Sequence, residues 1–132
     1  MKNLNTYKTF NIHEKTPECL YNELNKEFKF DLDPCPLFGI INGLEISWYG
    51  NIFINPPYGK EVKKWILKAL NEIKLNNCKT SVFLLPAYTD TKLFHEIIMP
   101  NAKEIRFLKG RLKFSDHENT APFTSMIVIF SL

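Results

Sequence analysis

A strand-like run that leads straight into two consecutive prolines constrains this chain more than any other feature. Residues 51–54 are mostly apolar, and Pro56 and Pro57 follow one residue later. Such a run is typical of a central strand in a sheet that is covered on both faces. Neither a helix nor a central strand continues through two prolines. Apolar residues then recur at helical spacing over residues 61–74, so we expect a strand, a rigid turn and an amphipathic helix in that order.

The same alternation of strands and helices extends along the chain. Helices are expected at residues 17–27, 61–74 and 91–99, and strands at residues 28–32, 51–54, 81–85, 104–108 and 125–132. Thr16 at the N-cap and Pro17 at the first helical position are typical of a helix start, and Asp90 is the expected cap of the helix at 91–99. No helix separates the last two strands. This order predicts a three-layer α/β domain with a mainly parallel sheet and a C-terminal antiparallel hairpin.

Length and composition limit the kind of protein. The 132 residues suit a single domain over 1–132, with residues 1–12 as a loose leader, and 45% hydrophobic residues suffice for a core. No apolar stretch has the length of a membrane helix. The three cysteines are widely spaced, which favours neither a disulfide framework nor a metal site. We therefore expect an intracellular, cytoplasmic protein with free thiols and no bound metal.

Polar residues follow two of the expected strands directly. Asp33 comes after the strand at 28–32, and Asn55 comes after the strand at 51–54. In open α/β sheets, ligands bind beyond the carboxyl ends of the strands. The two residues are therefore expected at one ligand site.

The turn at residues 55–58 carries the groups needed to modify the amino nitrogen of a planar base. The Asn55 side-chain oxygen and the Pro56 carbonyl can each accept one amino hydrogen, while Pro56 and Pro57 make the backbone rigid. Tyr58 offers a flat face for the base. The alternative is a rigid strand-exit turn with a packed tyrosine. The position between a buried strand and an amphipathic helix favours the functional interpretation.

An ordered series of motifs resembles the phage-type DNA N(6)-adenine methyltransferases. The matching residues run from about 14 to 130. They are Thr16-Pro17, Phe30 to Pro36, Gly43-Leu44, Trp48, Asn55 to Gly59, Trp65, Lys68-Ala69, Leu84 to Ala87, Thr89 to Thr91, Phe94-His95 and Lys109 to Phe114.

The resemblance implies a Rossmann-like, class I methyltransferase fold with S-adenosylmethionine as the methyl donor. The acceptor would be adenine in double-stranded DNA, flipped out of the stack, in a phage- or prophage-encoded enzyme that acts in the host cell. The implied catalytic residues are Asn55, Pro56, Pro57 and Tyr58. The implied cofactor-binding residues are Asp33, Pro34, Thr16 and Pro17, with Asp31 and Glu45 as candidates to hold the ribose hydroxyls.

Several basic residues are candidates for DNA contact. Lys109, Arg111 and Lys113 belong to a basic run that also contains Lys103 and Arg106. Lys60 lies beside the proline turn. Basic side chains bind phosphates without sequence preference, although solvated strand faces explain such charges equally well. The chain has no room for a separate recognition domain, so we expect either loose sequence specificity or a homodimer that builds a DNA-binding surface.

Two other functional interpretations remain open from the sequence. A methyltransferase could act on an RNA base or on a glutamine amide of a protein. Alternatively, the chain could be a catalytically degenerate module that binds DNA or a nucleotide. Trp48 and Trp65 are expected in the core.

Overall fold

A four-stranded mixed sheet forms the centre of the protein. The structure, a computed structural model, describes residues 16–36, 42–113 and 120–132, so the expected leader lies outside the described residues. The strand order is β1-β2-β4-β3. The strands are β1 (Gly50–Ile54), β2 (Cys78–Pro86), β3 (Glu104–Phe107) and β4 (Ser125–Ser131).

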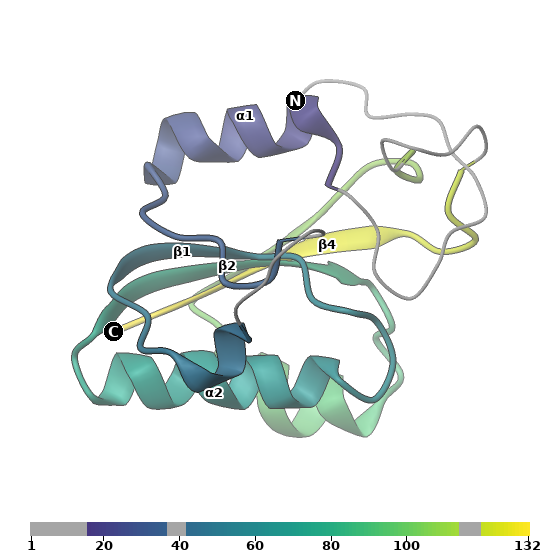
Figure 1. Ribbon diagram of the computed structural model, residues 1–132. Helices are drawn as coiled ribbons and strands as arrows, with labels where there is room; N and C mark the ends of the chain where they lie inside the picture. The colour runs from purple at the N-terminus through teal and green to yellow at the C-terminus, as the bar shows by residue number, and fades with distance from the viewer. Residues whose placement is uncertain (1–15, 37–41, 114–119) are drawn as a thin grey trace.

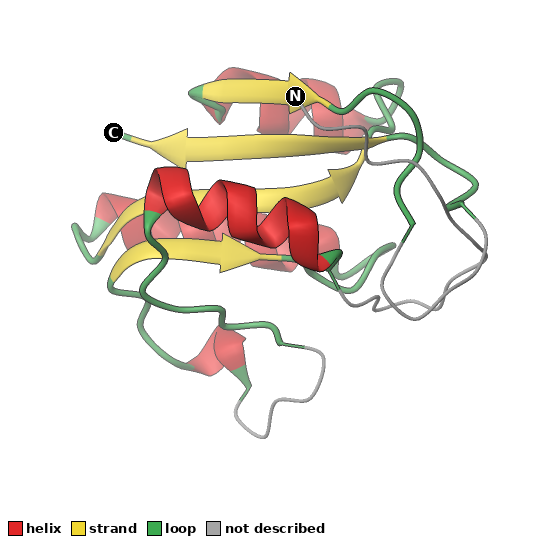
Figure 2. Ribbon diagram, turned by 90° about the horizontal axis from the view of Figure 1, so that it is seen from above, coloured by secondary structure: helices red, strands yellow, loops and turns green. Residues whose placement is uncertain are grey.

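The strand pairings only partly match the prediction. β1 pairs with β2 in parallel, whereas β4 pairs antiparallel with both β2 and β3. The C-terminal antiparallel pair is therefore confirmed, but a mainly parallel sheet is not, because two of the three pairings are antiparallel. Both of them involve β4, which ends near the C-terminus and points opposite to its neighbours in Figure 2.

Residues 28–32 do not form the predicted strand. Helix α1 (Glu18–Phe28) takes up Phe28, and Lys29 follows in the left-handed conformation at φ 52°. Asn25 explains the difference, because its backbone and side-chain oxygens accept the N–H groups of Lys29 and Phe30 at 2.8 and 2.9 Å. Of the expected strand, the structure retains a parallel bridge between Leu32 and Ile52.

Helices cover both faces of the sheet (Figure 1). α1 lies on one face, and α2 (Val62–Lys74) lies on the other together with the π-helical segment η2 (Leu93–Ile98) and the short α3 (Met99–Asn101). The expected helix at 91–99 is thus present, but Thr91 caps it instead of Asp90. The Thr91 hydroxyl accepts the N–H of Phe94 at 3.1 Å.

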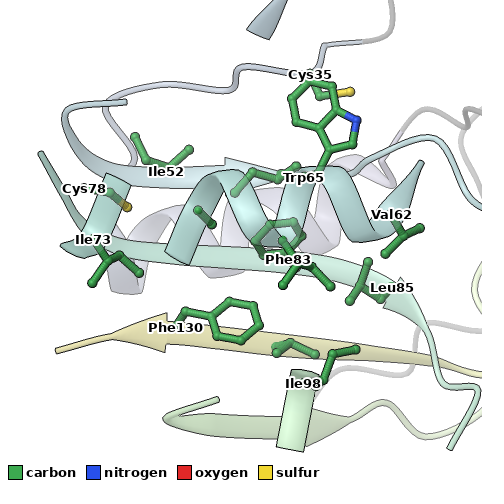
Figure 3. Close-up of a cluster of buried hydrophobic side chains, with 14 of the residues drawn as sticks. Cys35, Ile52, Val62, Trp65, Ile73, Cys78, Phe83, Leu85, Ile98 and Phe130 are labelled. Carbon is green, nitrogen blue, oxygen red and sulfur yellow. The ribbon is translucent and has the colours of Figure 1, made fainter. Parts of the chain in front are cut away.

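Alternate residues of each strand enter two separate core layers. Phe53, Val82 and Leu84 face α1, while their neighbours face α2. On the α2 side, Phe83 and Phe130 meet edge to face at 5.6 Å between ring centroids (Figure 3). Trp48 and Trp65 are buried in this layer, which confirms their expected place in the core. The sheet is therefore rigidly held on both sides.

In residues 16–36, 42–113 and 120–132, no helix combines the length and apolarity that crossing a membrane requires. The same ranges contain no group of three or more His, Cys, Asp or Glu side chains that could hold a metal ion.

Candidate active site

The proline turn leaves the sheet at the carboxyl end of β1 and leads into α2. Asn55 is 3% exposed, and Pro56 is also buried. Gly59 adopts φ 98°, a conformation that favours glycine, and its carbonyl accepts the N–H of Val62 at 3.3 Å. The predicted passage from buried strand through rigid turn to helix is confirmed.

Two hydroxyl groups hold the side-chain amide of Asn55. Its Nδ2 donates to Oγ1 of Thr16 at 2.9 Å, and its Oδ1 accepts from the hydroxyl of Tyr58 at 3.0 Å. The structure thus brings together three residues predicted for the site, although two of them lie 39 positions apart. The carbonyl oxygen of the amide faces Tyr58, the residue expected to stack on the substrate.

Thr16 does not cap α1 as the sequence suggested. The N-cap of α1 is Pro17, and no side chain makes a capping hydrogen bond there. The reason is that the Thr16 hydroxyl points to Asn55 on the strand below. Pro17 therefore stands one position earlier in the helix than predicted.

Two aromatic residues that the sequence patterns did not single out join Tyr58. The Phe123 ring meets Tyr58 edge-on at 5.6 Å and Tyr88 at 5.8 Å between ring centroids. Phe123 precedes β4, whose antiparallel direction places its beginning beside the carboxyl ends of β1 and β2. That direction is the signal that could have found Phe123. Tyr88 follows β2 at the same edge.

Asp33 and Pro34 run beside β1, because Leu32 bridges Ile52 in parallel. Asp33 Oδ1 accepts the N–H of Cys35 at 3.0 Å, which orients the carboxylate. Burial raises the pKa of Tyr21 on α1, and the negative charge of Asp33 raises it further. The Asp33 carboxylate thus acts on the side of the sheet that α1 covers.

Pro34 is held from the other side by the segment before β1. Gly43 lies so close that a Cβ atom on it would stand 1.8 Å from the Pro34 carbonyl oxygen. The Gly43 carbonyl in turn accepts the indole N–H of Trp48 at 2.8 Å. The buried carboxylate of Glu72 accepts the backbone N–H of Trp48 at 2.6 Å. Glu72, which no motif indicated, therefore anchors this segment to α2.

The two acids considered for the ribose hydroxyls lie in different parts of the structure. Asp31 Oδ2 accepts the N–H of Asn51 at 2.8 Å, at the amino end of β1 and away from Asn55. Glu45 is exposed on the 3-10 helix η1 (Gly43–Glu45).

A mainly apolar cavity of about 300 Å³ adjoins the turn. Its walls come from Gly59 and Val62 on one side and from Pro86, Tyr88 and Thr91 on the other. It lies where β1 and β2 both end, which is the edge at which α/β sheets bind ligands.

The basic residues proposed for DNA contact are exposed, whereas their neighbour Arg106 is paired with carboxylates. Lys60, Lys109, Arg111 and Lys113 are exposed. Arg106 instead donates two hydrogen bonds to the Glu27 carboxylate, both at 2.7 Å, and also pairs with Glu104. These partners raise the pKa of Arg106.

Fold and site together define an α/β protein whose candidate ligand site lies at the carboxyl edge of the sheet, around the Asn-Pro-Pro-Tyr turn. Residues 40–131 match the family described as DNA N-6-adenine-methyltransferase (Dam). The match spans most of the chain, so the chain belongs to this family, and the resemblance seen in the sequence is confirmed. The family name indicates methyl transfer to adenine, with DNA as the substrate. Neither the curated proteins nor the solved structures gave a match.

The family match covers the site unevenly. It includes Asn55 to Tyr58, Lys60 and the basic run at 109–113. It begins after Thr16, Pro17, Asp33 and Pro34. The roles of these four residues therefore depend on the geometry described above.

Proposed function

We propose that this protein transfers a methyl group from S-adenosylmethionine to the exocyclic amino nitrogen of adenine in DNA. The observation that carries the proposal is the buried amide of Asn55, held between two hydroxyls at the end of β1 with its oxygen beside Tyr58. This turn lies within the residues that match the family.

The chemistry requires an amino nitrogen whose lone pair points at the methyl donor. In adenine this lone pair is delocalised into the ring. Acceptance of both amino hydrogens, by Asn55 Oδ1 and the Pro56 carbonyl, would redirect it. The Tyr58 hydroxyl, now 3.0 Å from Oδ1, would share this oxygen with the substrate or release it. Preorganised groups of this kind lower the barrier because they need no rearrangement during the reaction.

Base stacking would hold the adenine in line with the donor. Tyr58 provides the face for the ring, a contact worth about 1–3 kcal/mol per base. The base would have to leave the duplex first, because the amino nitrogen is inaccessible within the stack. Phe123, which now meets Tyr58 edge-on, adds an aromatic boundary to the same space.

The residues near Asn55 suit the chemistry of S-adenosylmethionine, which supplies a methyl group on a cationic sulfur when bound. The carboxylate of Asp33, oriented by Cys35 N–H, complements the positive charge of the cofactor. Asp33 and Pro34 would hold the cofactor, with Pro17 beside them. The strand directions support the finer, Rossmann-like assignment of the fold, because β1, β2 and β3 run one way and β4 runs the other way among the described strands.

DNA phosphates would contact the exposed basic residues. Leu112, within the basic run at 109–113, accepts the N–H of Ala121 through its carbonyl at 3.0 Å, and Phe123 two residues later meets Tyr58. Lys60 directly follows the turn. A homodimer would extend this surface along the duplex.

A labelled-methyl transfer assay on unmethylated double-stranded DNA tests the proposal. The matched substrates are fully methylated DNA, RNA of the same sequence and a glutamine-containing protein substrate. We expect label in adenine of the unmethylated DNA alone. Label in RNA or in the protein substrate would show that the acceptor is not adenine in DNA. Binding of S-adenosylmethionine without transfer to any of the substrates would favour a degenerate binding module.

A further inference from the structure

We propose that Thr16 is a positioning residue, whose hydroxyl fixes the orientation of the Asn55 amide for catalysis. The inference rests on the proposed function of Asn55. It gives Thr16 a role in the chemical step, in place of the cofactor contact that the sequence suggested.

The Thr16 hydroxyl accepts a hydrogen bond from the side-chain amide of Asn55. The distance from Asn55 Nδ2 to Thr16 Oγ1 is 2.9 Å. The hydroxyl does not cap α1, since no side chain makes a capping bond at that helix start. The location of Thr16 just before α1 is therefore explained by Asn55 and not by the helix.

Holding Nδ2 decides where Oδ1 points. The terminal torsion of an asparagine side chain is broad and roughly two-fold, so the amide needs a partner to keep one orientation. Thr16 holds the nitrogen end, and the oxygen then faces the Tyr58 hydroxyl at 3.0 Å. An amide turned by 180° would present N–H groups to the amino group of a base, and it could not accept its hydrogens.

The backbone conformations of Thr16 and Asn55 are both restricted by the residue that follows. Thr16 precedes Pro17, and Asn55 precedes Pro56. A residue before proline is confined to extended conformations, and the β-branched side chain of threonine is stiff at χ1. The two dipeptides thus present their polar side chains to each other with little freedom. Such preorganisation matters, because a misplacement of about 1 Å can cost about 10²-fold in rate.

A positioning role and a cofactor-binding role give different kinetics. Loss of a contact to S-adenosylmethionine would raise the KM for this substrate. Loss of the amide orientation would lower kcat and leave that KM unchanged, because the affected contact is made to the adenine during the reaction.

The experiment compares Thr16→Val, which keeps the shape and removes the hydroxyl, with Thr16→Ser, which keeps the hydroxyl. Thr80→Val, at the amino end of β2, is the matched control. We expect Thr16→Val to lower kcat by about 10–10²-fold with an unchanged KM for S-adenosylmethionine. Thr16→Ser and Thr80→Val should stay close to the native rate. A raised KM with a native kcat in Thr16→Val would overturn the proposal.

A second readout is independent of activity. The side-chain amide signal of Asn55 in a ¹⁵N–¹H spectrum is identified by its loss in Asn55→Ala. We expect its hydrogens to exchange more rapidly with solvent in Thr16→Val and at the native rate in Thr16→Ser. Unchanged exchange in Thr16→Val would contradict the positioning role. This measurement also separates the two hypotheses, because an inactive native chain would refute the proposed function while the exchange data still decide the role of Thr16.

Discussion

Asn51 and Asn55 stand at opposite ends of β1 and are used in opposite ways. Asn51 donates through its side chain to the carbonyl of Phe28 at 2.7 Å, and its backbone exchanges two hydrogen bonds with Asp31. Asn55 has side-chain partners on both ends of its amide, Thr16 and Tyr58. The side chain of Asn51 thus binds a main-chain carbonyl, whereas the side chain of Asn55 binds hydroxyl groups.

This difference shows how one residue type serves structure at one end of a strand and chemistry at the other. A backbone carbonyl is placed by the fold and only accepts hydrogen bonds. A hydroxyl both donates and accepts, and it rotates to suit a new partner. The amino end of β1 is therefore fixed, whereas at Asn55 the Tyr58 hydroxyl can leave Oδ1 when a substrate enters.

The largest expected effect is a difference in methyl-transfer rate between variants of the two asparagines. Asn55→Ala should lower the methyl-transfer rate by about 10²–10³-fold, because it removes an acceptor aimed at the reacting amino group. Asn51→Ala should keep the native rate per folded molecule. Both are measured as initial rates with labelled cofactor. Equal loss of rate in the two variants would contradict the view that Asn55 serves chemistry and Asn51 serves structure.

The next effect concerns the backbone at the amino end of β1. Gly50 adopts φ 87°, and a Cβ atom on it would stand 2.2 Å from Asp31 Oδ2. Gly50→Ala should lower the free energy of unfolding by about 1–3 kcal/mol, as measured by urea denaturation. Gly59→Ala is the control, since Gly59 also has positive φ but its Cβ would meet no atom within 4 Å. Gly50→Ala should be the more destabilising of the two, and the reverse order would contradict this view.

A third prediction concerns the hydrogen bond from the Tyr58 hydroxyl to Asn55 Oδ1. Tyr58→Phe keeps the stacking face and removes the hydroxyl that donates to Oδ1 at 3.0 Å. Stability should fall by about 0.5–1.5 kcal/mol, while stacking of the base is retained. DNA binding measured by fluorescence anisotropy should therefore stay native. It should weaken in Tyr58→Ala, and native binding in that variant would argue against stacking.

The charges at the two ends of the sheet provide a fourth test. Single substitutions of Lys109, Arg111 or Lys113 by alanine should weaken DNA binding for all sequences and reduce the salt slope by about 1 for each lost phosphate contact. Lys79→Ala, at the amino end of β2, is the control and should leave the slope unchanged. The readout is the affinity over a range of salt concentrations. A reduced slope in Lys79→Ala would indicate that DNA does not favour the carboxyl edge.

The smallest effect is a pH dependence at the far end of α1. Hydrogen bonds from Arg106 hold the pKa of Glu27 below its ordinary value. The stability from this exposed pair is therefore fully present above the ordinary pKa of glutamate, and it is lost as the pH falls through the lowered pKa. Its size should be below about 1 kcal/mol. Glu27→Gln should remove this part of the acid dependence in urea titrations, whereas Glu23→Gln should keep it.

Local features of the sequence predicted local structure well. The passage through residues 51–74 was predictable because prolines and helical periodicity act over a few neighbours. The strand expected at 28–32 was wrong because the side chain of Asn25 caps the chain there, and apolar alternation carries no sign of this bond. The antiparallel pair of β3 and β4 was predicted, whereas the place of β4 between β2 and β3 depends on partners distant in the chain.

The contacts of the site are less predictable for the same reason. Thr16 looked like a helix cap, yet its partner is 39 residues away. Arg106 looked like one of several free cations, yet its carboxylate partner Glu27 is 79 residues away. In both cases the local pattern identified a polar residue correctly and could not identify its partner.

The position of β4 has a consequence for biosynthesis. This strand is the last to be synthesised among those described, yet it lies between β2 and β3 in the interior of the sheet. Until residues 125–131 leave the ribosome, β3 has no neighbouring strand and Phe123 has no fixed place beside Tyr58. Because domains generally fold as units during synthesis, Phe123 and Tyr58 should come together only when translation of this segment is complete.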